Sequence, residues 1–263
     1  MRDPLIMVAP NGAYKTQGDH PAVPVTIAEL VETAVSCFQA GAVAIHAHIR
    51  DDEGRHTLDA DRYSELLSAL DTAVPDMRVQ ITTEAAGRYS ASDQRALLDK
   101  ITPPWISAAV REILADNDLE AARRFYQQAA RQGTQVQHIL YDAADVERLD
   151  QLIEDDVVGG FLPSVLFVLG RYTENRESTP ADLLPFLQAR QASRHLSDCH
   201  FMACAFGSRE IDCLLATAEA GGDCRIGFEN NLLTSSGEMA ADNASQVEYL
   251  RQQLTQAGFF NNT

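Results

Sequence analysis

Short apolar runs alternate with amphipathic stretches along the whole chain. The first apolar run covers 5–8, and residues with helical spacing follow from Thr26 until Gly41. Thr26 and Glu29 form the sequence of a helix-capping box, and glycine commonly follows the last residue of a helix. A second apolar run, 42–48, comes directly afterwards. The pattern therefore predicts strands and helices in alternation.

The alternation repeats eight times, at a spacing of about 30 residues. Strands are expected at 5–8, 42–48, 79–82, 105–108, 135–141, 161–169, 200–205 and 224–228. Helices are expected at 27–40, 59–70, 92–100, 118–131, 143–154, 180–191, 210–220 and 245–254. Strands that alternate with helices form a parallel sheet, and eight pairs in about 250 residues match a closed (β/α)8 TIM barrel.

One domain over 1–263 is expected, because no linker, low-complexity tract or block of charge divides the chain. A doubly wound open sheet is the alternative fold. That fold usually carries G-x-G-x-x-G after its first strand, whereas the corresponding loop, 9–13, reads Ala-Pro-Asn-Gly-Ala. The sequence therefore favours the barrel.

Charge and cysteine content narrow the range of functions. The chain has 38 acidic and 21 basic residues and a formal net charge of −17, so it repels phosphate backbones and anionic lipid surfaces. We therefore expect no nucleic acid and no membrane surface as partners. A membrane span is also not expected, since no apolar run approaches the ~18 residues that one needs. Five cysteines form an odd set without a C-x-x-C pair, which is typical of reduced thiols in the cytoplasm.

Two histidines, His46 and His48, end the second apolar run. Side chains two residues apart on a strand point to the same face, so both imidazoles would enter one space. Glu229 ends the eighth expected strand, and barrel enzymes place their chemistry at the C-terminal strand ends. Two histidines and a carboxylate form a common catalytic zinc set with one position open. The alternative is a solvated histidine pair and an exposed glutamate.

Other polar residues follow the remaining expected strands. Arg225 shares the inward parity of Glu229, and it either pairs with an acid or orients a reactive group or a substrate anion. Arg111 is a candidate ligand for a substrate carboxylate, and its alternative is a surface ion pair with Glu112. The same rim receives Asn11, Tyr14, Thr82, Glu84 and Asn230, with Tyr14 in a loop that could cover the mouth. The far wall of the pocket is expected to come from Ser107, Gln137, Ile139 and Tyr141.

Two motifs are more specific than a general barrel pattern. His-x-His-x-Arg-Asp covers 46–51, and Gly-Phe-Glu covers 227–229. Together with the segments 9–13, 24–29, 80–83 and 167–170, these motifs resemble the β-keto acid cleavage enzyme family, which includes 3-keto-5-aminohexanoate cleavage enzyme. The resemblance extends along nearly the full length of the chain.

The resemblance implies a (β/α)8 barrel that binds a divalent metal, usually zinc, through His46, His48 and Glu229. It also implies a reaction in which a β-keto acid and acetyl-CoA give acetoacetate and a new acyl-CoA. The metal would act as a Lewis acid on the keto-acid oxygens, and a base would remove the proton between the two carbonyls. Family members are usually homo-oligomers, so a homo-oligomer is expected here.

The chain departs from the family at three of these positions. Ser-Thr-Gly-Gly follows the third strand in the family, whereas 82–85 reads Thr-Thr-Glu-Ala and adds the carboxylate of Glu84. Family members carry an aspartate base directly after the metal-binding glutamate, where this chain has Asn230. They also carry an acid where this chain has Tyr14. Asn11, Tyr14, Arg111 and Asn230 are the candidate substrate-binding residues.

The asparagine after Glu229 cannot accept the proton that the family reaction removes. Glu84 is therefore expected to supply the base, with Thr82 or Arg225 orienting it. The alternative is that Glu84 forms an ion pair with Arg88 or Arg111 and has no catalytic role.

Two other functions stay open at the level of sequence. A metal-dependent hydrolase of the amidohydrolase kind would place His-x-His on the first strand and add later histidine and aspartate ligands, which this chain lacks apart from His138. A metal-binding barrel that has lost or redirected its catalysis is made possible by Asn230.

Overall fold

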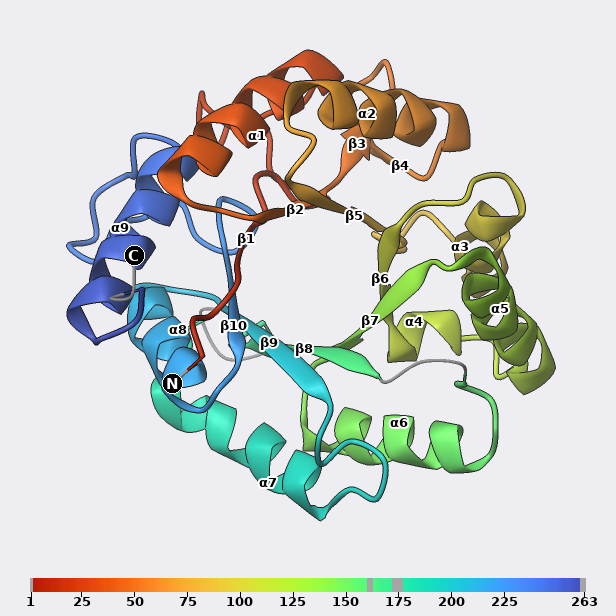
Figure 1. Ribbon diagram of the computed structural model, residues 1–263. Coiled ribbons are helices and arrows are strands. Elements are labelled where there is room, and N and C mark those ends of the chain that lie inside the picture. Colours follow the sequence, from red (N-terminus) through yellow and green to blue (C-terminus); the bar gives the residue numbers. More distant parts are fainter. Residues whose placement is uncertain (1, 160–162, 172–176, 261–263) are drawn as a thin grey trace.

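Eight parallel strands close into a barrel, and helices surround it on the outside (Figure 1). The computed structural model describes residues 2–159, 163–171 and 177–260. Around the barrel the order is β1, β10, β9, β8, β7, β6, β5, β2, so that β1 pairs with both β10 and β2. The predicted TIM barrel is confirmed, and the closed sheet excludes the open-sheet alternative.

The barrel strands coincide with the eight predicted apolar runs. They are β1 Ile6–Val8, β2 Ala44–Ala47, β5 Arg78–Thr82, β6 Trp105–Ala109, β7 Gln135–Leu140, β8 Ser164–Leu169, β9 His200–Ala205 and β10 Asp223–Ile226. Two residues of the sixth predicted strand, 161 and 162, lie outside the described residues.

The helices also follow the prediction. They are α1 Ile27–Ala40, α2 Ala60–Ala73, α3 Ala91–Arg95, α5 Leu119–Gln132, α6 Ala143–Glu154, α7 Leu184–Ala192, α8 Glu210–Glu219 and α9 Asn243–Gln256. The capping box at Thr26 and Glu29 is present, and Gly41 ends α1 in the left-handed conformation with φ of 110°. None of the helices in the described part of the chain combines the length and apolar character needed to span a bilayer.

Four local features differ from the prediction. The helix expected over 180–191 begins with a 3₁₀ turn, Pro180–Leu183, before α7. The segment after β2 forms a two-stranded hairpin, β3 Ile49–Arg50 and β4 His56–Thr57. The helix expected over 92–100 divides into α3 and a 3₁₀ turn, Ala96–Asp99, and a short helix α4, Val110–Ile113, directly follows β6. Strands of two residues and helices of four are too short for a period to show in the sequence.

The core divides between the two faces of the barrel wall. The larger apolar cluster lies between the strands and the helices and includes Ile45, Leu66 and Phe167. A smaller cluster, which includes Met7 and Leu166, lines the interior of the barrel. Because the wall is packed on both sides, the strand ends at the C-terminal rim are held rigidly.

Candidate active site

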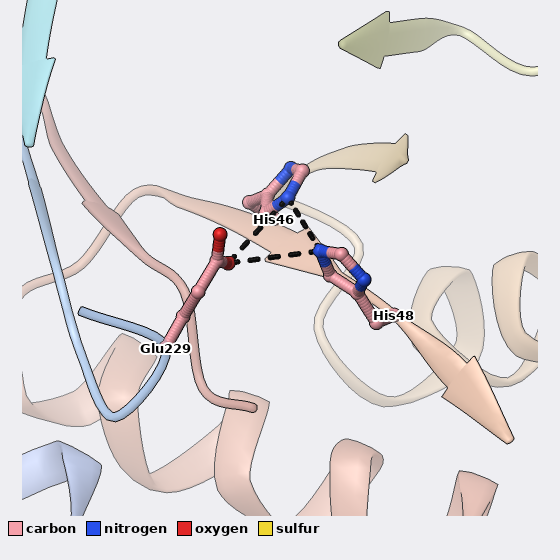
Figure 2. Close-up of side chains that lie close together, drawn as sticks. All are labelled: His46, His48 and Glu229. Atoms are coloured by element: carbon pink, nitrogen blue, oxygen red, sulfur yellow. Dashed lines mark hydrogen bonds and ion pairs between the residues drawn. The ribbon is translucent and has the colours of Figure 1, made fainter. Parts of the chain in front are cut away.

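Three side chains from two strand ends converge at the C-terminal rim (Figure 2). His46 lies in β2, His48 follows shortly after, and Glu229 comes just after β10. The Nε2 atoms of His46 and His48 are 3.0 Å apart. Glu229 Oε2 lies 3.6 Å from His46 Nε2 and 3.7 Å from His48 Nε2. The fold thus brings the three predicted metal ligands together.

The arrangement suits a divalent metal ion. Bonds of about 2.0–2.1 Å to tetrahedral zinc place neighbouring ligand atoms about 3.3 Å apart, and the observed separations of 3.0, 3.6 and 3.7 Å lie around that value. Glu229 Oε2 is buried and has no hydrogen-bond partner among the described residues. A cation between the imidazoles and this oxygen would satisfy it, since a buried acceptor without a partner is costly.

The charge states of the three groups also match metal binding. Burial lowers the pKa of His46 to about 4 and the pKa of His48 well below its usual range, so both imidazoles are neutral at pH 7. Burial acts to raise the pKa of Glu229, but Arg225 and His46 outweigh it and hold this pKa below its ordinary value. Two neutral nitrogens and one carboxylate are the protonation states that a metal requires.

A glutamine on the neighbouring strand orients the first histidine. Gln80 of β5 is paired in register with His46, and its Oε1 accepts from His46 Nδ1 at 2.7 Å. This bond places the proton on Nδ1 and leaves the Nε2 lone pair directed at the centre. Gln80 Nε2 in turn donates to Gln137 Oε1 at 3.1 Å. Gln80 was not predictable as a site residue from the sequence, because its contact with His46 follows from strand register.

Asn11 holds the second histidine through its backbone. The Asn11 side-chain amide is buried and donates to the carbonyls of His48 and Pro24, each at 2.9 Å. These bonds fix the end of β2 against the loop after β1. The structure thus gives Asn11 a part in placing a candidate metal ligand, and its expected contact with substrate stays a prediction.

Glu229 can approach the two histidines because the residue that its side chain packs against is a glycine. Gly12 has φ of +60°, and a Cβ at this position would lie 2.5 Å from Glu229 Cγ. Arg225 Nη2 donates to Glu229 Oε1 at 3.0 Å. The carboxylate therefore presents its other oxygen, Oε2, to the two histidines.

Glu84 lies beside the three candidate ligands. Its Oε2 is 3.8 Å from His48 Nε2, and its Oε1 is 3.3 Å from Arg171 Nη2. The backbone N–H of Glu84 donates to Thr82 Oγ1 at 3.0 Å, and its carbonyl accepts from His56 Nε2 at 2.9 Å. Thr82 and His56 therefore fix the backbone that carries this carboxyl group.

The non-catalytic alternative pairs Glu84 with Arg88 or Arg111, whereas the ion pair found in the structure is with Arg171. Arg88 pairs with an aspartate of the β3–β4 turn. Arg111 pairs with Asp145 at 2.7 Å and also with Asp142, both at the start of α6. The surface ion pair that the sequence suggests for Arg111 is instead with Glu112. Burial, together with the negative charge of the nearby Glu229, raises the pKa of Glu84 to about 7.

Two buried polar side chains at the rim have hydrogen-bonding capacity to spare. Arg225 is 3% exposed and lines the mouth of the barrel, which is the cavity that His46, Glu84 and Glu229 also line. Neither Nε nor Nη1 of Arg225 has a partner among the described residues. Asn230 is 5% exposed, and both atoms of its amide group also lack a partner within the described chain. A substrate that carries several oxygen atoms would satisfy the donors of Arg225, whereas Asn230 is not among the described residues that line the mouth and its contact with substrate stays a prediction.

Several residues that line the mouth beside the candidate metal ligands are apolar. They are Ala109, Ile139, Val168 and Phe206, from the ends of β6 to β9, with Tyr141 and Arg171 beside them. The predicted wall residues Ser107 and Gln137 lie one layer deeper, because side chains on one face of a strand recur every second residue. Among the described residues that line the mouth, neither Arg111 nor Tyr14 is found, and Tyr14 is 62% exposed.

A family model described as beta-keto acid cleavage enzyme matches residues 4–259. The chain belongs to the β-keto acid cleavage enzyme family. The resemblance carried by the segments 46–51 and 227–229 is confirmed, and the match gives the amidohydrolase alternative no support.

Named members of the β-keto acid cleavage family are similar over nearly the whole chain. The 3-oxoadipate:acetyl-CoA acetyltransferase of Cupriavidus necator is 24% identical over 248 residues, which cover 92% of this chain and 85% of that protein. The 3-keto-5-aminohexanoate cleavage enzyme of Acetoanaerobium sticklandii is 25% identical over 255 residues, which cover 93% of this chain and 89% of that enzyme.

Solved structures show the same fold at lower sequence identity. The ternary complex of ObcA with a C4-CoA adduct and oxalate superposes with a TM-score of 0.71 at 16% identity, and the match covers 91% of this chain and 65% of ObcA. A type I 3-dehydroquinate dehydratase from Clostridium difficile superposes with a TM-score of 0.62 at 14% identity, over 98% of this chain and 93% of that enzyme. The barrel is therefore shared beyond the β-keto acid cleavage family.

Proposed function

We propose that this member of the β-keto acid cleavage family is a metal-dependent acyltransferase that converts a β-keto acid and acetyl-CoA into acetoacetate and a new acyl-CoA. One observation carries the proposal. The His46, His48 and Glu229 triad, with its unpartnered carboxylate oxygen, lies next to Arg225, a buried arginine with two donors that lack a partner among the described residues. This pair of features suits a small substrate that has both a carboxylate and a neighbouring carbonyl group.

The triad would hold a divalent metal, for which zinc is the expected ion. When bound, the metal would supply Lewis-acid polarisation of the keto-acid oxygens and so lower the cost of removing the proton between the two carbonyls. Manganese, cobalt and iron also accept two histidines and a carboxylate, so metal analysis of the purified protein is needed to identify the ion.

The chain's own residues divide the remaining work. Arg225 binds the substrate carboxylate through its free donors, and the amide of Asn230 binds a second substrate oxygen. Glu84 accepts the proton between the carbonyls, while Thr82 keeps the backbone of Glu84 in place. The supporting geometry is the position of Glu84 at the rim, with its carboxylate facing the candidate ligand His48.

The proposed reaction balances without any further reactant. The carbanion left by proton removal attacks the acetyl carbonyl of acetyl-CoA, and the CoA thiolate leaves. The thiolate then attacks the keto carbonyl that bears the substrate tail, and the bond between this carbon and the new acetoacetyl unit breaks. Acetoacetate takes back a proton and departs, and the tail leaves as an acyl-CoA.

The apolar wall indicates the class of substrate tail. Ile139, Val168 and Phe206 offer no hydrogen bond to a tail, and the nearby cation Arg171 is already paired with Glu84. Glu112 also lines the mouth but already accepts from the backbone N–H of Ala85, so a charged tail placed against the apolar residues would lose its hydration with little compensation. We therefore propose a β-keto acid with an uncharged, mainly apolar tail.

The test is a coupled assay on metal-analysed protein. β-Keto acids of similar length but with apolar, ammonium-bearing and carboxylate-bearing tails are offered with acetyl-CoA, and acetoacetate release is followed. Turnover that is highest with the apolar tails is expected. A preference for a charged tail would refute the proposed tail class, and no turnover with stoichiometric metal present would refute the proposed reaction in favour of lost or redirected catalysis.

Two further properties are proposed with the function. The five cysteines are free and buried, which supports a reducing compartment such as the cytoplasm. A homo-oligomer is proposed from the family resemblance, and light scattering on the purified protein would test it.

A further inference from the structure

A second cavity lies outside the barrel wall, between α8 and α9 and next to the segment that follows β10. Its volume is about 420 Å³, within the range of small-molecule sites. Ile226 of β10, Ile211 of α8 and Tyr249 of α9 contribute its apolar walls. The connections after β9 and β10 line both this cavity and the mouth, through Ser208 and Asn231 on one side and Phe206 and Glu229 on the other.

The cavity contains two buried polar side chains whose hydrogen bonding is incomplete. Glu210 is 2% exposed, and its Oε2 accepts from Asn231 Nδ2 at 3.1 Å while its Oε1 has no partner among the described residues. Gln246 is 6% exposed, and its Nε2 donates to the Asn231 carbonyl at 2.9 Å while its Oε1 also lacks a partner within that part of the chain. The mouth chemistry uses neither residue.

The two groups can act as complementary hydrogen-bonding partners. Burial raises the pKa of Glu210 well above its ordinary value, which favours the protonated carboxyl group, whose O–H is a donor. Gln246 Oε1 can only accept. A cavity with one donor, one acceptor and apolar walls suits a neutral chain that contains a secondary amide.

We propose that this cavity binds the pantetheine arm of acetyl-CoA, an inference that rests on the proposed function. An amide of the arm would donate to Gln246 Oε1 and accept from Glu210, while its dimethyl-bearing carbons pack on the apolar walls. Asn231 lines the cavity and Glu229 lines the mouth, and the two residues are at most ~7 Å apart along the chain, so an arm whose thioester end lies at the mouth would be within reach of the cavity. The nucleotide end of CoA stays at the surface.

A substitution at the edge of the cavity provides the first test. Ala241 lines the cavity and is exposed, so Ala241→Trp would narrow it without disturbing the core. The KM for acetyl-CoA is expected to rise at least tenfold, with kcat and the KM for the β-keto acid within twofold of wild type. Ala220→Trp, at the exposed far end of α8, is the matched control and is expected to leave all three constants unchanged.

A pair of substitutions at Glu210 tests the hydrogen bond itself. Glu210→Gln keeps a donor and the acceptor for Asn231, so a KM for acetyl-CoA close to wild type is expected. Glu210→Met removes both, and a rise of about tenfold is expected from the loss of a buried hydrogen bond. Equal effects of Gln and Met would contradict the proposed contact. If the Met variant does not fold, Ala241→Trp still decides.

Calorimetry with free pantetheine separates this proposal from the proposed function. Binding to the wild type that is lost in Ala241→Trp would support the cavity even if no β-keto acid is turned over, in which case the proposed function alone fails. Normal turnover by the wild type, together with an unchanged acetyl-CoA KM in Ala241→Trp, would overturn the cavity proposal and leave the function standing.

Discussion

Strand β10 has an acidic residue near each end, and the two residues have different surroundings. At the N-terminal end, Asp223 Oδ1 accepts from Arg2 Nη2 and from a backbone N–H, each at 2.8 Å, and its Oδ2 lies 3.3 Å from His200 Nδ1. At the C-terminal end, Glu229 accepts from Arg225 with one oxygen, and its other oxygen has no hydrogen-bond partner among the described residues.

The two clusters contain the same residue types, an acid, an arginine and histidine, so composition does not separate them. They differ in how many of their hydrogen-bond donors and acceptors have a partner. The Asp223 cluster has partners for both carboxylate oxygens, and two of its members, Arg2 and His200, are half exposed. The Glu229 cluster is buried and unsaturated, and burial without a partner is tolerated mainly where a ligand completes the set. The Asp223 cluster links the N-terminal segment to β10, whereas the Glu229 cluster keeps an unsatisfied oxygen that a bound ligand would complete.

Removing a histidine from each cluster should give the largest contrast. His46→Ala is expected to abolish turnover and to lower the metal content well below one ion per chain, because two ligands cannot hold a catalytic zinc site. His200→Ala is the matched control, and its metal content and kcat should equal those of the wild type. Metal is measured by mass spectrometry after dialysis, and chelation of the wild type should reproduce the loss of activity. Stoichiometric metal in His46→Ala would refute the assigned site.

Glu84→Gln should have the next largest effect. A kcat lower by about 10²–10⁴-fold is expected, because the amide cannot accept the substrate proton, and general bases contribute on this scale. Metal content should be unchanged. Glu112→Gln is the control, since Glu112 lines the same mouth but accepts from the backbone N–H of Ala85, an interaction that glutamine keeps. Full activity in Glu84→Gln would exclude Glu84 as the base.

A glycine pair tests how closely the Glu229 carboxylate is placed. Gly12→Ala puts a Cβ against Glu229 Cγ, whereas a Cβ on Gly87, which also has a positive φ of 69°, would meet nothing within 4 Å. Both substitutions carry the same kind of backbone strain, so the difference between them reports on Glu229. Gly12→Ala is expected to weaken metal affinity by about 10–100-fold, as disturbed ligand placement does. Equal affinities in the two variants would contradict this role.

The barrel strands and the long helices could be predicted from the sequence, because each of these elements repeats a period. The helix α1 is an example, since Thr26, Glu29 and Gly41 mark both of its ends and all three act as predicted. The β3–β4 hairpin could not be predicted. Its strands are two residues long, and a charged turn that includes Asp51 gives no alternation to detect.

The candidate site was predictable where it depends on parity along one strand. His46 and His48 are two residues apart, and Glu229 ends a strand that can reach the same rim. Contacts that depend on neighbouring strands or on loop paths leave no such signal. Gln80 meets His46 only through the register of β5 against β2, and Arg111 of α4 pairs with the two aspartates at the start of α6.

Asp223→Asn should have the smallest effect on activity, and it completes the comparison of the two acids. Asparagine keeps an acceptor for the backbone N–H but loses the charge that faces Arg2 and His200. Because Arg2 is 51% exposed, the expected cost is only about 1 kcal/mol of unfolding free energy, as for other pairs with an exposed partner. Urea denaturation measures that cost, while kcat, KM and metal content should match the wild type. A loss of metal in Asp223→Asn would mean that the two ends of β10 are coupled, and that the Asp223 cluster does more than link the N-terminal segment to β10.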